Sequence, residues 1–588
     1  MSFSRRNFLI STGVAAGGAM VLSACGSDDS GSGGGGSKSK GPSVSGSKAS
    51  TVAVGTKADS TGPAPEIAGA KKGGTIYITD RDDFPHLDPQ RIYYAYTQAA
   101  MIPLHRGLTG YKTDTKGVSI LVGDLATDAG TVTDGGKTWK FTLKDGLKWQ
   151  DGKPVTTEDV KWSFERGFAD FTTEGPTYVE TWLEGGAKYK GPEKGKRIAS
   201  VEVDGQDITF TLQEAHADFN FALAMMGYCI VPKKHDTQEK YDKLPFSCGP
   251  YMIKSHTTDK SLVMVRNPHW DAKLDPIRNN YPDRYDFTFG FQALTTTDRF
   301  IADSGKDQYA VTLLNEVAPE RIQKVMTDPN LKKRVTSHIG AGTYYWAINM
   351  TRITDLEVRK ALNYAWPNQQ IRQLRGGPAT SEIASTVLSP LIAGREDFDL
   401  YGKLKKPAGD PEKAKETLKK AGKLGQKIVF AFPRSDVQMK VSVAIVNALK
   451  KAGFDPVAKA IDSTSYYDEI GQLDNKFDVM SGGWVADWPT GYTALQPCFD
   501  SKEVRNMGNN WPQLKDASVD KAIAAATAET DPKAAGKAWA AVDRKIMEQA
   551  VVVPDYYPLR NYMHGSKVGN HTYDGAYDCP ALHKMYAM

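Results

Sequence analysis

The strongest structural signal in this chain is DGGKTWKFTLKDGLKWQDGKPVTTEDVKWSFER, which spans residues 134–166. Trp139 and Phe141 alternate with polar residues, which is the pattern of a half-buried strand, and two Asp-Gly pairs mark the turns that follow. Thr156 is a favoured helix N-cap, and Gly167 is a favoured stop. The stretch therefore predicts a strand, turns and a helix, in that order.

The same stretch begins with Gly135-Gly136-Lys137-Thr138, which is similar to the end of a phosphate-binding loop. A phosphate loop needs a further glycine five positions before Gly136, where this chain has Thr131. The segment also leads into a strand instead of a helix. We therefore predict a hairpin turn here and no nucleotide site.

Length and composition set the class of protein. A chain of 588 residues exceeds one hydrophobic core, so two or three domains are expected. With 40% hydrophobic and 24% charged residues, the composition is that of a globular protein, and a net charge of +5 is small for this size. Nucleic acid is therefore not expected as a partner.

The first 25 residues have the pattern of an export signal. Arg5 and Arg6 precede an apolar run that is too short for a membrane-spanning helix. The segment resembles a bacterial twin-arginine signal, and Leu22-Ser23-Ala24-Cys25 resembles a lipobox. The resemblance implies that residues 1–24 are removed and that Cys25 carries lipid; the alternative is a soluble secreted protein.

Residues 25–72 are rich in glycine, serine and lysine and almost free of apolar side chains. Such a segment cannot bury a core, so we predict a disordered tether between the lipid and the folded body.

In the rest of the chain, the pattern of predicted strands and helices changes between the first and the second half. Strand patterns recur at 75–78, 201–212 and 262–265, and the second half alternates strands with helices, which indicates an α/β domain. Its predicted strands are 344–349, 428–432 and 551–554, and its helices are 355–366, 411–421, 437–451, 518–529 and 532–549.

A second informative stretch is FDVMSGGWVADWPTGY, residues 477–492, where an apolar strand runs into two glycines and two tryptophans. Asp487 lies between Trp484 and Trp488. Burying a carboxylate beside aromatic rings is costly unless it meets a cation, so a ligand ammonium is an attractive partner. The alternative is that Asp487 only caps the turn at Pro489.

Catalytic and metal-binding motifs are missing: GxSxG, HExxH and CxxC do not occur. We therefore predict no enzyme activity, no metal and no cofactor. Four cysteines remain besides Cys25, and an even number in an exported chain favours two disulfides. Three pairings are possible; the short spacing of the first two favours Cys229 with Cys248 and leaves Cys498 with Cys579.

From about residue 73 to the C-terminus, the chain resembles the large peptide-type solute-binding proteins of ATP-driven importers, family 5, which includes oligopeptide- and dipeptide-binding proteins. The segments that carry the resemblance are Leu87-Asp88-Pro89, residues 134–166, Cys248-Gly249-Pro250-Tyr251, Val265-Arg266-Asn267-Pro268-His269-Trp270, residues 355–366 and residues 552–558.

The resemblance implies an α/β, two-lobed periplasmic-binding-protein-like fold of type II, cluster C, with an extra domain and a hinge. Domain I would take 73–95, 195–338 and 557–588, domain II 96–194, and domain III 339–556. Lobe 1 would hold the first two domains, and lobe 2 the third.

The resemblance also implies a function: a monomer on the outer face of the cytoplasmic membrane captures short peptides and delivers them to a permease with cytoplasmic ATPases. Asp487 would bind the peptide α-ammonium. The other expected ligand-binding residues are Gly483 and Val485 through their backbones, Trp484 and Trp488 as walls, and Phe84 and His86 in the loop before the LDP motif.

Two alternatives remain at this point. A protein of the same fold could bind another solute, such as an oligosaccharide or a chelated metal, and a lipid-anchored hydrolase is a more distant possibility. Ser481 stands where some peptide binders carry an arginine for the ligand carboxylate, so strict length selection is not expected.

Overall fold

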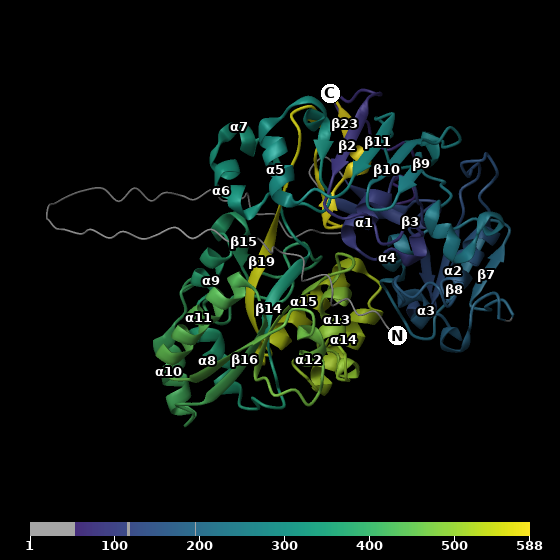
Figure 1. Cartoon of the computed structure of the whole chain (residues 1–588). Helices are drawn as coiled ribbons and strands as arrows, with labels where there is room; N and C mark the ends of the chain where they lie inside the picture. The colour runs from purple at the N-terminus through teal and green to yellow at the C-terminus, as the bar shows by residue number, and fades with distance from the viewer. Residues whose placement is uncertain (1–52, 114–117, 195) are drawn as a thin grey trace.

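The computed structural model describes residues 53–113, 118–194 and 196–588, which form two lobes. In Figure 1, lobe 2, mostly green and yellow, lies below lobe 1, which is purple, blue and teal. The export signal and Cys25 lie outside the described residues.

Lobe 1 is built on three main sheets, and residues 568–587 add two short two-stranded ones. A five-stranded sheet has the order β12-β2-β11-β10-β9, and a three-stranded sheet has the order β1-β4-β3. Their strands are β1 (Ala53–Val54), β2 (Thr75–Thr79), β3 (Thr109–Thr113), β4 (Ser119–Gly123), β9 (Tyr251–Thr257), β10 (Ser261–Arg266), β11 (Arg284–Thr288) and β12 (Ala310–Val311).

The third sheet of lobe 1 comes from the opening stretch of the sequence. Its order is β5 (Thr131–Thr133), β6 (Thr138–Thr142), β8 (Asp207–Thr211) and β7 (Val201–Asp204). The β5–β6 pairing confirms the predicted hairpin in place of a phosphate loop. Because β8 pairs with β6, and β7 pairs with β8, the expected domain boundary at residue 195 would divide a sheet.

Helix α2 (Thr157–Arg166) follows this hairpin as predicted. The Thr156 side chain accepts from the Asp159 backbone N–H, and the Asp159 carboxylate accepts in return, which is a complete capping box. Gly167 is the C-cap. The local sequence therefore defines both ends of the helix.

Lobe 2 holds a mostly buried seven-stranded sheet of order β13-β19-β14-β18-β16-β17, with β15 paired to β19. Its strands are β13 (Val335–Ile339), β14 (Gly342–Ile348), β15 (Ser381–Ile383), β16 (Lys427–Pro433), β17 (Asp455–Ile461), β18 (Val479–Val485) and β19 (Val552–Met563). Its longer helices are α8 (Leu356–Ala365), α10 (Pro411–Lys420), α11 (Asp436–Lys451), α13 (Gly491–Phe499), α14 (Ala517–Ala528) and α15 (Pro532–Glu548).

Two adjacent strands connect the lobes. β19 pairs with β14 inside lobe 2 and, at its other end, with β13, which leads out of lobe 1. Figure 1 shows the yellow β19 running from the lower lobe toward the upper one. A pair of crossing strands of this kind can act as a hinge.

The predicted tether is shorter than expected. From residue 53 the chain packs on lobe 1: β1 pairs with β4, and the Ser60 hydroxyl accepts from the Gly123 backbone N–H at 2.9 Å. The prediction of disorder for 53–72 is wrong because an available strand edge and polar contacts can order a segment that has few apolar side chains.

The disulfide prediction is also wrong. Cys229, Cys248, Cys498 and Cys579 are buried, and no disulfide joins any of the described cysteines. Each thiol packs as a small apolar group in the protein core. Burial raises the pKa of Cys248 to about 12.

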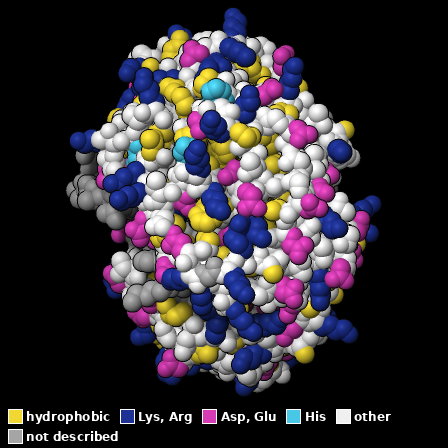
Figure 2. All heavy atoms as spheres, turned by 90° about the vertical axis from the view of Figure 1, so that its right-hand side faces the viewer, with side chains coloured by type: hydrophobic (Ala, Val, Ile, Leu, Met, Phe, Trp, Pro, Cys, Tyr) yellow, Lys and Arg dark blue, Asp and Glu magenta, His cyan; other side chains and the backbone are white. Residues whose placement is uncertain are grey.

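The surface carries charges of both signs. Figure 2 shows Lys and Arg interspersed with Asp and Glu over one face of the molecule, in agreement with the small net charge. Among the residues with described placement, no helix is both long and apolar enough to cross a membrane.

Candidate functional site

The site is built around β18, which follows the predicted strand closely. β18 pairs with β14 along its whole length, from Val479 to Val485. On its other side it pairs with β16 only at Val479 and Met480. Within the described parts of the chain, no strand pairs with that side of residues 481–485, so this edge can accept an added strand.

Gly482 and Gly483 are required by close packing inside lobe 2. A Cβ on Gly482 would lie 2.5 Å from Cζ3 of Trp511, and one on Gly483 would lie 2.8 Å from Cδ1 of Tyr344. The sequence suggested that these glycines admit a ligand; the structure shows that they admit two aromatic rings of the same lobe.

Asp487 lies in the turn between β18 and α13 and faces lobe 1. Tyr93 donates from its hydroxyl to Oδ1 of Asp487 at 2.8 Å, and Tyr178 donates to Oδ2. Both tyrosines belong to lobe 1, and Tyr178 is separated from Asp487 by 309 positions in the sequence. The carboxylate therefore meets groups from the opposite lobe and does more than cap its own turn.

The two tryptophans beside Asp487 differ in their surroundings. Trp484 is half-buried and donates from Nε1 to the Thr493 carbonyl at 2.7 Å. Trp488 is only 1% exposed, and the ring of Tyr178 meets it edge-on at 4.8 Å. Trp488 is thus part of the contact between the lobes, and Trp484 is the more accessible ring.

Asp218, which precedes helix α4 (Phe219–Ala222) in lobe 1, makes a second link between the lobes. Its Oδ2 accepts from Nε1 of Trp488 at 2.7 Å and from the Thr490 hydroxyl. Burial raises the pKa of the Asp218 carboxyl, although both hydrogen bonds act in the opposite direction. The described lobes are therefore in contact around residues 487–490.

An arginine lies near the start of the open edge. The Arg375 guanidinium lies 4.8 Å from the ring of Tyr556 and donates to Oε1 of Gln438 at 3.2 Å. Gln438 in turn donates to the Ser481 hydroxyl at 3.4 Å. Nε of Arg375 is buried without a hydrogen-bond partner, so this group can still bind an anion.

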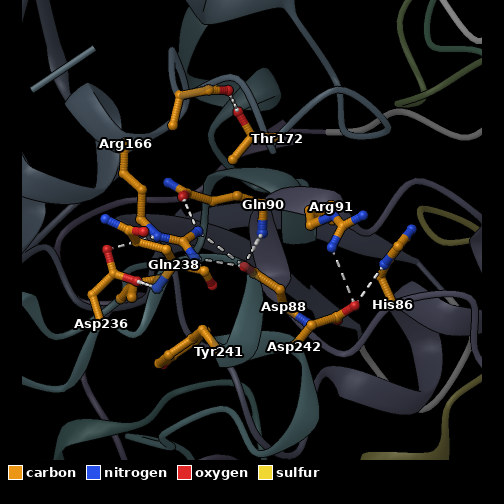
Figure 3. Close-up of polar contacts among 12 residues, drawn as sticks. His86, Asp88, Gln90, Arg91, Arg166, Thr172, Asp236, Gln238, Tyr241 and Asp242 are labelled. Atoms are coloured by element: carbon orange, nitrogen blue, oxygen red, sulfur yellow. Dashed lines mark hydrogen bonds and ion pairs between the residues drawn. The ribbon is translucent and has the colours of Figure 1, made fainter. Parts of the chain in front are cut away.

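Phe84 and His86 are not brought to Asp487. Phe84 is buried in lobe 1 against Phe287 and Phe289, edge-on at 5.6 and 5.5 Å. His86 contacts Oδ2 of Asp242 through Nδ1 at 2.7 Å (Figure 3). In this structure both side chains support the LDP loop.

The LDP loop is held by a buried ion pair at its centre. Asp88 is fully buried and accepts from Arg166 at 3.0 and 2.6 Å, and Arg166 also donates to Asp236 at 3.0 Å. Figure 3 shows Arg166 pointing toward Asp88 and Gln90. This ion pair joins the LDP motif to the end of α2.

Over the described ranges, no group of three or more His, Cys, Asp or Glu side chains could hold a metal ion.

Four residues at this site were not predicted: Tyr93, Tyr178, Asp218 and Arg375. Each lies far from β18 in the sequence, and a single tyrosine, aspartate or arginine carries no local signal of such a role. Only the tertiary arrangement brings them to residues 481–490.

The chain matches known proteins along most of its length. The profile "Bacterial extracellular solute-binding proteins, family 5 Middle" matches residues 121–506. The probable D,D-dipeptide-binding periplasmic protein DdpA of Escherichia coli is 25% identical over 81% of this chain and 87% of its own length. The periplasmic oligopeptide-binding protein OppA of Salmonella typhimurium is 25% identical over 74% and 79%.

A solved structure has the same architecture. The clavulanic acid biosynthesis oligopeptide binding protein 2 superposes with a TM-score of 0.81 at 29% identity and covers 90% of this chain and 100% of its own. Since the family profile spans well over half of the sequence, this chain belongs to the bacterial extracellular solute-binding proteins of family 5.

Proposed function

We propose that this protein captures short peptides between its two lobes and delivers them to the permease of an ABC importer, which is driven by cytoplasmic ATPases. The observation that carries the proposal is the position of Asp487, a carboxylate at the end of an open strand edge and opposite two tyrosine hydroxyls of the other lobe. The names of its relatives support peptides as the ligand class.

Binding would begin on the open edge of β18. An extended peptide pairs its backbone with residues 481–485, and such pairing is insensitive to side-chain identity. Its α-ammonium reaches Asp487, where it adds a charge-assisted hydrogen bond to those from Tyr93 and Tyr178. The same contacts that order the ligand therefore draw the two lobes together.

The other end of the peptide would meet Arg375. This guanidinium is linked through Gln438 to Ser481, the first residue of the open edge. A carboxylate can accept from its unpaired Nε. The site thus offers a negative group and a positive group at opposite ends of one edge, which matches the two termini of a peptide.

The test is ligand identification followed by a measurement of closure. Native mass spectrometry of protein purified from its own host should show bound peptides, and saturation with one of them should reduce the radius of gyration in solution scattering. A neutral oligosaccharide as the bound mass, or no compaction on saturation, would contradict the proposal.

We also propose that the protein is a monomer held at the outer face of the cytoplasmic membrane by lipid on Cys25, after export by the twin-arginine route. This rests on Arg5, Arg6 and the lipobox before Cys25. Cys25→Ala should release the protein into the medium, and Arg5→Lys with Arg6→Lys should block export. Retention of Cys25→Ala on membranes in high salt would refute the anchor.

A further inference from the structure

A cavity of about 190 Å³ lies between the lobes, separate from the residues assigned above to the peptide backbone and termini. Lobe 1 contributes Trp139, Asp218 and Asn220 to its lining, and lobe 2 contributes Glu529 and Trp539. The cavity adjoins the Asp487 turn through Trp488, whose indole donates to Asp218. It is therefore complete only when the lobes meet.

The charged side chains that line the cavity are both carboxylates, Asp218 and Glu529. The two hydrogen bonds to Asp218 end on Oδ2, and no described residue donates to Oδ1. Asn220 is 4% exposed and donates from Nδ2 to the Ala129 carbonyl, while its Oδ1 has no partner. A buried acceptor without a donor is unusual and points to a missing donor group.

Burial raises the pKa of Asp218, which shows that the charged carboxylate is penalised where it stands. A cation in the cavity would offset that penalty. Trp139, Phe221 and Trp539 also line the cavity, and an aromatic ring that presents its face to a planar or compact cation adds cation–π attraction.

The size of the cavity limits its occupant. At about 30 Å³ for each water molecule, the space corresponds to about six waters, or to a group of about six non-hydrogen atoms. An alkylguanidinium or a short alkylammonium group fits this size, whereas a whole lysine or arginine residue with its backbone, about nine to eleven non-hydrogen atoms, does not.

We propose that this cavity is a second ligand subsite, which takes one guanidinium or primary ammonium group between Asp218 and Asn220 of lobe 1 and Glu529 of lobe 2. The inference rests on the proposed lobe-closing function, because the carboxylates come from different lobes. An occupant that contacts both would stabilise the closed form.

The first test uses ethylguanidinium and its neutral isostere ethylurea, which have the same number of non-hydrogen atoms. Calorimetry on the full-length protein should show ethylguanidinium binding with a Kd on the order of millimolar, as expected for so small a fragment, and ethylurea binding at least tenfold more weakly. Equal binding of the two compounds, or no binding of ethylguanidinium, would overturn the proposal.

Substitutions of the cavity carboxylates test whether ethylguanidinium binds in this cavity. Asp218→Asn keeps an acceptor for Trp488 and removes the charge, and we expect it to weaken ethylguanidinium binding at least tenfold. Glu529→Gln should weaken it about threefold, because the Glu529 carboxylate lies in an exposed setting, where it already accepts from the Asp531 backbone N–H at 2.9 Å. Glu214→Gln makes the same chemical change on an exposed residue outside the lining and is the matched control. Unchanged binding in both Asp218→Asn and Glu529→Gln would also overturn the proposal.

The cation can come from a peptide side chain or from a separate small molecule, and peptides distinguish the sources. Matched peptides that carry lysine or norleucine are compared in wild type and in Asp218→Asn. If the side chain is the source, the preference for lysine disappears in the variant. If the cation is separate, ethylguanidinium and a norleucine peptide bind together.

Failure of the subsite proposal can be distinguished from failure of the proposed peptide-binding function. Peptides that bind and depend on Asp487, without any ethylguanidinium binding, would leave the peptide function standing and refute only this subsite.

Discussion

Two carboxylates of this protein, Asp88 and Asp487, have opposite kinds of hydrogen-bond partner. Asp88 lies inside lobe 1, where Arg166 of the same lobe holds it through two charge-assisted hydrogen bonds at 3.0 and 2.6 Å. Asp487 lies at the contact between the lobes, and neutral tyrosine hydroxyls from the other lobe donate to it. The first pairing lies within one lobe and persists when the lobes open, whereas the second joins the two lobes and is broken when they open.

The difference shows where the molecule is rigid and where it can respond. A fully paired buried charge resists every motion that would separate it from its partner, because each charge alone is costly. Hydroxyl contacts across a hinge cost little to break and leave the carboxylate able to take a stronger donor. We expect stability to depend on Asp88 and ligand affinity on Asp487.

Breaking the ion pair between Asp88 and Arg166 should have the largest effect, which is a loss of stability. Arg166→Met leaves Asp88 buried without its cation and should lower the free energy of unfolding by about 3–5 kcal/mol. Chemical denaturation measures this loss. Arg321→Met is the matched control, because Arg321 pairs with Asp298 on the surface, and no measurable change is expected. Equal effects of the two variants would contradict the comparison.

The second contact between the lobes should set the balance between open and closed forms. Asp218→Ala removes the acceptor of Trp488 and Thr490. One hydrogen bond to a charged group contributes about 1.5–3 kcal/mol, so loss of even one of the two should lower the population of the ligand-free closed form by a factor of about 10 to 100. Scattering should then show a larger radius of gyration than for wild type or for Glu214→Ala. An unchanged radius would show that this contact does not hold the lobes together.

Single tyrosine hydroxyls should matter less. Tyr178→Phe and Tyr93→Phe each remove one donor to Asp487, and each should weaken peptide binding about fivefold, which corresponds to about 1 kcal/mol. Tyr189→Phe serves as the control, because its buried hydroxyl has no partner. A loss in the control as large as in the two variants would remove the special role of these hydroxyls.

The smallest effect is expected for thiol labelling, which tests whether each lobe stays folded around its buried cysteines. Burial raises the pKa of Cys248 to about 12, and Cys229 and Cys579 are shifted in the same direction for the same reason. Cys498 is buried as well, so at pH 8 in the native protein the four thiols should resist a thiol reagent, and all four should react after unfolding. Fast labelling of the native form, or disulfide-linked peptides in an unreduced digest, would contradict the packing described above.

The parts of this structure that the sequence predicts are those with local signals. The ends of α2 follow from Thr156, Asp159 and Gly167, and the course of β18 follows from its apolar run and glycines. The contacts of Asp487 could not be predicted, because Tyr178 is 309 positions away and its helix α3 (Tyr178–Trp182) carries no marked pattern.

The incorrect predictions have a common cause. Composition suggested disorder for 53–72, and cysteine count suggested two disulfides. Both arguments use averages over many proteins, whereas the outcome here depends on one strand edge at β4 and on the apolar surroundings of each thiol.

The most direct test of the account is a double-mutant cycle on Asp487 and the peptide α-ammonium. Calorimetry compares a bound peptide and its N-acetylated form, each with wild type and with Asp487→Ala. Leaving either charge without its partner costs about 3–5 kcal/mol, so each single change should weaken binding at least a hundredfold. The two changes together should weaken it little further, because they remove the same interaction. Equal affinity of wild type for the free and acetylated peptides would contradict the account.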